Sequence, residues 1–439
     1  MSPQGTVDLE RGRDVAAERA GVPAAEGRTR GWTKYDTGWT LSLFGTAIGT
    51  GILFLPINAG AGGLWPLLIV TALIGPMTYL SHRGLSRLVC ASPRSDGDIT
   101  VVVRDYFGEG AGKLITALYF LAIYPIVLIY GVGITNTVDS LIVNQLGMAS
   151  PPRWLLSGAL VALMMGVMIA GQRIMLLVTE WLVYPLLAIL LGVTLYLVPS
   201  WQVGDMLSAP VPSAGDLAMS VWLIIPVLVF AFNFSPAISQ FSVAMRGRYG
   251  TDAPAKASAV LRRTTVLLVI FAMGFVWSCV FALGPNGLAA AREANLPVLS
   301  YLANVHGSPF IGYLGPAVAI VAIVSSFFGH YLGAAEGAAG IVRGVAQGRG
   351  ARLDERALRR GIAAFIFVTT WVAAIANPSI LGLIETLAGP VIASVLYLMP
   401  MIAIRRVPAL AAYRGRLSNV FVTIAGVVAV AGILLSIVR

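Results

Sequence analysis

Long apolar runs alternate with short polar connections over almost the whole chain. A helix that crosses a bilayer needs ~20 mostly apolar residues, because each residue rises ~1.5 Å along the axis. This pattern predicts an all-α polytopic membrane protein with eleven spans, at residues 40–59, 64–80, 114–137, 154–170, 176–198, 217–243, 264–283, 310–333, 362–376, 380–404 and 420–438.

The first predicted span contains three closely spaced glycines, Gly45, Gly49 and Gly51, in the run GTAIGTG. A glycine inside a helix costs ~1 kcal/mol relative to alanine, so we expect the helix to be interrupted there. Non-helical backbone at membrane depth survives only where it is packed in protein or lines a polar cavity. The interruption is therefore a candidate binding site.

A second interruption is predicted in the sixth span, where the run FNFSP places Asn233, Ser235 and Pro236 within an apolar helix. Proline removes a backbone donor and clashes with the preceding turn, and a simple kink is the alternative interpretation. An interruption five helices after the first favours two inverted five-helix repeats. We expect a disordered tail at 1–34, repeats at 35–200 and 201–405, and an additional helix at 406–439.

Two interrupted helices expose backbone groups of both kinds. Each new N-terminus presents free N–H groups with a positive dipole end, and each new C-terminus presents free carbonyl groups. A zwitterionic amino acid needs both, because its carboxylate requires donors and its ammonium requires acceptors.

Composition and charge agree with a membrane protein. Hydrophobic residues make up 57% of the chain and charged residues 11%, with a mean hydropathy of +0.82. All but three of the 30 lysines and arginines fall on one side of the predicted spans, the exceptions being Arg153, Arg292 and Arg439. Positive residues stay on the cytoplasmic side, so we expect a cytoplasmic N-terminus and a periplasmic C-terminus. The net charge of +10 is then explained without nucleic acid.

Several motifs give the chain a resemblance to the hydroxy and aromatic amino acid permease family, which shares the leucine transporter fold. The motifs extend from residue 36 towards the C-terminus and are GTAIGTGILFLPINAG (45–60), PMTYLSHRGLSR (76–87), AIYPIVLIYGVGITNTV (122–138), FNFSP (232–236), SFFGHYLGAAEG (326–337) and NPSILGLIETLAGP (377–390). The resemblance implies ion-driven uptake of a small hydroxylated amino acid, serine or threonine, across a bacterial inner membrane.

The same resemblance implies roles for individual residues. Backbone N–H groups at Thr46, Ala47, Thr50 and Gly51 should hold the substrate carboxylate. Carbonyls near Phe232, with Asn233 and Ser235, should meet the ammonium. Tyr124 and Tyr130 are candidates to close the pocket, with packing as the alternative for each. A small polar pocket favours serine or threonine, and an aromatic amino acid is the alternative.

Histidine is the most informative polar residue within the spans. His330 lies near the middle of the eighth span, one turn after Ser326, where the related fold borders the substrate side chain. A neutral imidazole offers one donor and one acceptor, which suits a serine hydroxyl or proton transfer. A histidine bonded to a backbone carbonyl is the alternative. His82 and His306 fall at predicted helix ends and are expected to be hydrated.

The sequence allows two coupling ions, a proton or sodium. Relatives carry a lysine before the serine of the SFxGHYLG motif, which is consistent with proton coupling, whereas this chain has Ser325. Ala322, Ser325 and Ser326 share one helical face, and with the carbonyls of Gly45 and Ile48 they match a sodium site of the wider fold. The alternative is that the serines bond their own helix. Proton coupling is the first expectation and sodium the second.

Four acidic residues, Asp139, Glu180, Glu336 and Glu385, lie within a few turns of predicted helix ends, where we expect hydration or pairing with arginines such as Arg173. Any one of them is a candidate proton carrier.

The segment 284–309 is too polar to span and is expected to form short helices over the pathway. The chain lacks the grouped nucleophile and base of an enzyme. The sequence predicts no cofactor beyond a coupling ion, and it does not indicate an oligomeric state. A membrane sensor or a channel is the remaining alternative to a transporter.

Overall fold

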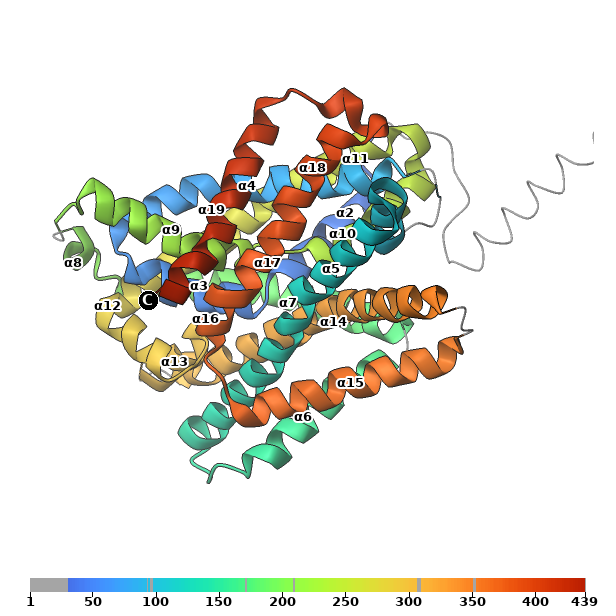
Figure 1. Ribbon diagram of the computed structural model, residues 1–439. Helices are drawn as coiled ribbons and strands as arrows, with labels where there is room; N and C mark the ends of the chain where they lie inside the picture. Colours follow the sequence, from blue (N-terminus) through green and yellow to red (C-terminus); the bar gives the residue numbers. More distant parts are fainter. Residues whose placement is uncertain are drawn as a thin grey trace, which may run out of the picture.

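The computed structural model describes residues 31–92, 94, 98–169, 172–207, 210–305, 309–349 and 353–438, and all regular structure in these ranges is helical (Figure 1). The α-helices are α2 (Lys34–Ala47), α3 (Thr50–Ala61), α4 (Leu64–Cys90), α5 (Ile99–Ser140), α6 (Arg153–Ile169), α7 (Gln172–Tyr196), α8 (Val203–Leu207), α9 (Ala214–Ala231), α10 (Ser235–Tyr249), α11 (Ala253–Leu268), α12 (Gly274–Glu293), α13 (Val298–Val305), α14 (Pro309–Gly348), α15 (Glu355–Ala376), α16 (Ile380–Leu383), α17 (Gly389–Ala393), α18 (Met399–Arg406) and α19 (Leu417–Val438).

Short π-helical and 3-10 segments connect several of these helices. The π-helical turns are Leu141–Gln145, Val269–Met273, Ile384–Ala388 and Ser394–Leu398, and the 3-10 turns are Val198–Ser200, Gly250–Asp252 and Pro408–Tyr413. Through these turns, α10 to α12 and α16 to α18 form two long helical runs, at Ser235–Glu293 and Ile380–Arg406.

The first interruption lies where the glycine pattern predicts it. Helix α2 begins with a capping box between Thr33 and Asp36 and ends at Ala47, and α3 starts at Thr50 after the extended residues Ile48 and Gly49. The two helices are bent by 56° at this break. Most of the expected tail, residues 1–30, lies outside the described residues.

The second interruption is also present. Helix α9 ends at Ala231 and α10 begins at Ser235, so Phe232, Asn233 and Phe234 form a non-helical connection. Pro236 lies in the first turn of α10, where the missing N–H of proline costs nothing. Proline here starts a new helix rather than kinking a continuous one.

The two interrupted helices pack closely at their breaks. A Cβ atom on Gly51 would lie 2.7 Å from both the Cα atom of Ala231 and the ring of Phe230, so only glycine permits this approach. Helices α5 and α14 make the most extensive contact in the bundle and pass beside the break in α2 and α3. At another face, α17 and α19 lie side by side (Figure 1).

Seven helical runs in the described ranges are long and apolar enough to cross a membrane, or eight if the bent α2–α3 pair is one span. Three shorter apolar helices lie at Arg153–Met168, Tyr184–Ser200 and Leu417–Gly432. A polytopic, all-helical membrane protein is therefore confirmed. The polar segment after the seventh predicted span forms the end of α12 and α13, which confirms the expected short helices.

Candidate functional site

Four helices meet at the first interruption. A Cβ atom on Gly49 would lie 2.5 Å from the Oγ atom of Ser326 and 3.0 Å from the hydroxyl oxygen of Tyr130. Ser326 belongs to α14 and Tyr130 to α5, so the break between α2 and α3 is in direct contact with both helices. The glycine is required here because any side chain would push these three elements apart.

A chain of hydrogen bonds connects α5, α14 and the break at the end of α2. The Ser326 Oγ atom lies 2.9 Å from the carbonyl oxygen of Thr46, which can only accept, so Ser326 donates its hydrogen to it. The Tyr130 hydroxyl, at 2.7 Å, must then donate to Ser326. The Thr46 carbonyl belongs to the last turn of α2 and lacks an intrahelical partner because of the break. Ser326 thus fixes the backbone of the interruption.

His330 completes this cluster. Its Nδ1 atom lies 2.9 Å from the carbonyl oxygen of Ser326, so Nδ1 carries the hydrogen and Nε2 keeps the acceptor lone pair. The ring packs edge-on against Tyr130, with 5.2 Å between centroids and an interplanar angle of 74°. The backbone bond matches the alternative role considered from the sequence, yet it leaves one acceptor nitrogen.

The N-terminus of α3 is open. Gly49 is its N-cap residue and has no side chain to bond the first N–H groups of the helix. Thr50 is fully buried, and its hydroxyl is one of the buried side-chain groups in the described chain without a hydrogen-bond partner. An uncapped helix N-terminus with its positive dipole end is the kind of feature that favours an anion.

The N-terminus of α10 is occupied by the protein itself. The Asn233 Oδ1 atom accepts from the N–H of Ser235 at 3.0 Å, and the His82 Nε2 atom accepts from the N–H of Phe234 at 3.1 Å. The amide nitrogen of Asn233 is buried and, within the described residues, unpartnered. This orientation differs from the expected role of Asn233, because the group left to meet a ligand is a donor and not an acceptor for an ammonium.

Most of the expected substrate-binding residues lie at the two breaks or beside them, and they are buried: Thr46, Ala47, Thr50, Gly51, Tyr130, Phe232, Asn233, Ser235, Ser326 and His330. Tyr124 is the exception. Its ring stacks between Phe120 and Phe365, with centroids at 4.8 and 5.4 Å, on the side of α5 that faces α15. These contacts match the packing alternative considered for Tyr124, which lies on a different face of α5 from Tyr130.

The residues of the expected sodium site are also buried: Gly45, Ile48, Ala322, Ser325 and Ser326. The Ser325 hydroxyl donates to the carbonyl of Ala322 at 3.1 Å, which is the bond to its own helix considered as the alternative. The Ser326 hydroxyl bonds across to Thr46 instead. Both oxygens keep lone pairs that could coordinate a cation.

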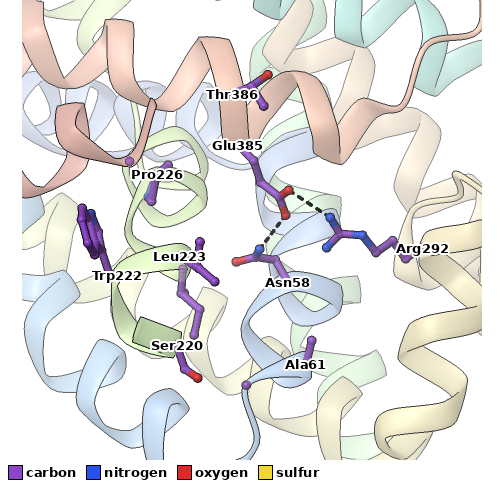
Figure 2. Close-up of a pocket in the computed structure, with 12 residues that line it drawn as sticks. Asn58, Ala61, Ser220, Trp222, Leu223, Pro226, Arg292, Glu385 and Thr386 are labelled. Atoms are coloured by element: carbon purple, nitrogen blue, oxygen red, sulfur yellow. Dashed lines mark hydrogen bonds and ion pairs between the residues drawn. The ribbon is translucent and has the colours of Figure 1, made fainter. Parts of the chain in front are cut away.

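A second polar cluster lies at the far end of α3 from the interruption (Figure 2). Glu385 accepts from the Asn58 Nδ2 atom at 2.8 Å and from Arg292 at 2.9 Å. These residues border a cavity of about 360 Å³ between α3, α9, the π-helical turn Ile384–Ala388 and α19. Glu385 was expected to be hydrated or paired with an arginine, and the pairing is confirmed.

Two residues that make these contacts, His82 and Asn58, were not predicted correctly from the sequence. His82 was expected at a hydrated helix end, but it is 1% exposed, and its helix α4 continues to Cys90. Asn58 was not among the residues predicted from the sequence, although an amide side chain within the apolar run GILFLPINAG indicates a buried polar contact. His306 lies outside the described residues, as do the side chains of Arg173 and Glu180.

The sequence profile of the tryptophan/tyrosine permease family matches residues 37–437. The chain belongs to this family. Its curated relatives include the serine transporter SdaC of Escherichia coli K12, which is 50% identical over 410 residues covering 92% of this chain and 96% of that protein. The serine transporter SdaC of Shigella flexneri matches to the same extent. This membership confirms the family resemblance and makes the chain a permease rather than an enzyme.

Solved structures show the same fold at low sequence identity. The chain superimposes on MhsT in complex with L-phenylalanine with a TM-score of 0.58 and 14% identity, covering 94% of this chain and 99% of that one. A Na⁺-coupled sialic acid symporter gives a TM-score of 0.56 at 12% identity, covering 92% and 90%. Both support the leucine transporter fold, which the permease family was expected to share.

Proposed function

We propose that this permease takes up a small hydroxylated L-amino acid, L-serine or L-threonine, together with a cation. The observation that carries the proposal is the pair of buried, unpartnered polar groups on the two facing breaks, the Thr50 hydroxyl and the Asn233 amide nitrogen. Each unpaired buried polar group costs ~1–3 kcal/mol, which a polar substrate would recover. The name of the SdaC relatives supports serine as the first substrate to test.

The asymmetry of the breaks sets the orientation of the substrate. The open N-terminus of α3 receives the carboxylate, because the corresponding N–H groups of α10 are already bonded by Asn233 and His82. The ammonium then faces the C-terminal ends of α2 and α9. The carbonyls of Thr46 and Phe230 each accept one hydrogen bond there, from the Ser326 hydroxyl and the Asn233 N–H, and each keeps a second lone pair for the substrate. The Asn233 amide nitrogen donates to the carboxylate or to the substrate hydroxyl.

The side-chain hydroxyl of serine fits the remaining groups. Thr50 offers a hydroxyl, and His330 offers an acceptor nitrogen beside Tyr130. These are small polar groups, so an aromatic side chain would lie against unpaired donors and acceptors. A site of this kind rejects an analogue that lacks the hydroxyl more strongly than one that differs by a methyl group.

Alternating access requires each end of the pathway to close. At the end beyond α3, Glu385 connects Asn58 to Arg292. At the opposite end, the buried carboxylate of Asp36 accepts from the Tyr249 hydroxyl at 2.7 Å and lies 3.6 Å from the Lys256 Nζ atom. We assign the Asp36 end to the cytoplasm and the Glu385 end to the periplasm, because the connections near Asp36 carry the basic residues.

The complete topology in this proposal has eleven spans. The broken pairs α2–α3 and α9–α10 are the first and sixth spans. Each broken pair is the first span of a five-span repeat, and the second repeat is inverted relative to the first. Helix α19 is the eleventh span and places the C-terminus in the periplasm. No oligomeric partner is needed, because the residues of the site come from one chain.

Proton coupling is the first choice for the cation, and Glu336 is its proposed carrier. The Glu336 Oε1 atom is buried and unpartnered in the described structure, whereas Glu385 is paired and Asp139 bonds Ser150. A buried carboxylate oxygen without a cation partner inside a span is costly, and binding of a proton removes that cost. Sodium at Ser325 and Ser326 is the alternative.

Uptake of radiolabelled L-serine into proteoliposomes tests the function, with proton and sodium gradients imposed separately. Accumulation that collapses with one gradient supports coupled transport and identifies the ion. Ser325→Ala should abolish sodium stimulation if sodium binds there, and unchanged sodium dependence would reject that site. Failure to take up any hydroxylated amino acid under either gradient would reject the proposed function.

A further inference from the structure

His82 makes two contacts that require the same protonation state. Its Nδ1 atom lies 2.8 Å from the carbonyl oxygen of Thr78, which only accepts, so Nδ1 carries the hydrogen. Its Nε2 atom lies 3.1 Å from the backbone nitrogen of Phe234, which only donates, so Nε2 carries the lone pair. Both nitrogens of a neutral imidazole are therefore used.

The ring of His82 also holds the side chain of Phe234. The two rings stack with 3.6 Å between centroids and an interplanar angle of 17°. Both residues are buried, at 1% and 0% exposure. Farther along the same pair of helices, Ser86 of α4 bonds Ser242 of α10 through their hydroxyl oxygens at 2.9 Å. Helix α4 therefore supports α10 at two points, the N-cap residue Phe234 and Ser242.

We propose that His82 is a positioning residue that sets which way the amino acid lies in the site. By accepting from the Phe234 N–H, it removes from the second break a donor that would otherwise compete with α3 for the substrate carboxylate. It also holds the connection 232–234 in the shape that presents the Asn233 amide nitrogen and the carbonyls at the end of α9. This inference rests on the proposed function of the two breaks.

Three substitutions separate the properties of the imidazole. His82→Gln keeps an acceptor at about the reach of Nε2, His82→Asn keeps a donor for Thr78 but is too short to reach Phe234, and His82→Phe keeps the stacked ring alone. We expect the KM for L-serine to stay within about threefold of the parent in the Gln variant. We expect it to rise about tenfold or more in the Asn and Phe variants, the usual effect of leaving a buried backbone donor unpaired.

The full-length variants are compared by uptake into proteoliposomes after each has been shown to be monodisperse. If the Phe variant does not fold, the Asn variant carries the same comparison. A role limited to packing predicts the opposite order, with Phe closest to the parent. Near-parental KM in either the Phe or the Asn variant, or equal loss in all three, would overturn the inference. Absence of serine uptake by the parent protein would instead reject the proposed function.

Discussion

The hydroxyl of Ser326 donates to the carbonyl oxygen of Thr46 at 2.9 Å, and this bond attaches the first interruption to α14. The second interruption is attached to a different helix, α4, through the bond from the Phe234 N–H to His82. The two halves of the candidate site are thus held by separate supports. A relative shift of α4 against α14 would change the distance between the two breaks, which we propose bind the two ends of a zwitterion.

Tyr130→Phe should weaken serine binding about tenfold, because the Ser326 hydroxyl would lose its donor and the cluster its link to His330. Tyr124→Phe is the matched control, since its ring stacks on Phe120 and Phe365 without need of its hydroxyl. The measurement is the KM for serine uptake of each variant. Equal effects of the two substitutions would show that the Tyr130 hydroxyl has no special role.

Gly51→Ala should abolish uptake, because the new methyl group would lie 2.7 Å from the Cα atom of Ala231 and force the two breaks apart. Gly38→Ala adds the same methyl group to α2, where nothing lies within 4 Å, and should leave uptake unchanged. Folding is checked by size-exclusion chromatography and thermal unfolding of both variants. Normal uptake by a folded Gly51→Ala protein would mean that the breaks need not touch.

Asn233→Asp separates the roles of the oxygen and the nitrogen of the Asn233 side chain. The carboxylate can still accept from the N–H of Ser235, but it replaces the unpartnered amide donor with a negative charge. Serine affinity should fall about 100-fold, since a donor to the substrate becomes a group that repels its carboxylate. Tighter binding of serine would instead show that this position meets the ammonium, as the sequence suggested.

The sequence predicted the two breaks because their cause is local. The glycines at 45–51 and Pro236 weaken any helix that contains them, and the expected spacing of five helices directs attention from one break to the other. The rotation of a helix about its axis is not local. Tyr124 and Tyr130 are about 120° apart around α5, and hydropathy did not distinguish which of them faces the break.

The error at His82 has a related cause. The predicted second span ended at residue 80 because the next residues are polar, yet α4 continues to Cys90. Two of its buried polar side chains have partners far away in the sequence: His82 accepts from the N–H of Phe234, and Ser86 bonds Ser242. A hydropathy window cannot include such partners, because they lie more than 150 residues away in the chain.

Glu385→Gln should loosen the closure at the end of α3, because it removes the ion pair with Arg292 while keeping an acceptor for Asn58. Arg292 and Glu385 are 45% and 24% exposed, so the pair is worth about 1 kcal/mol at most. A cysteine at Ala61, which borders the cavity, should then react about twofold to fivefold faster with a charged maleimide. The Glu385→Arg, Arg292→Glu double variant should restore the slower rate. An unchanged rate in Glu385→Gln would remove this cluster from the closing mechanism.

Glu336→Gln should separate serine movement from the proton gradient. The amide imitates the proton-bound acid permanently, so the variant should exchange serine across the membrane but no longer accumulate it when the outside is made acidic. The other groups that act electrostatically here are Asp98, at the start of α5, and the buried hydroxyl of Tyr119, and both remain in place. Asp139→Asn is the control, since Asp139 bonds Ser150 at an exposed position. Proton-driven accumulation that survives in Glu336→Gln would place the coupling proton elsewhere, whereas loss of exchange as well would mean that Glu336 supports the structure of the α5–α14 contact.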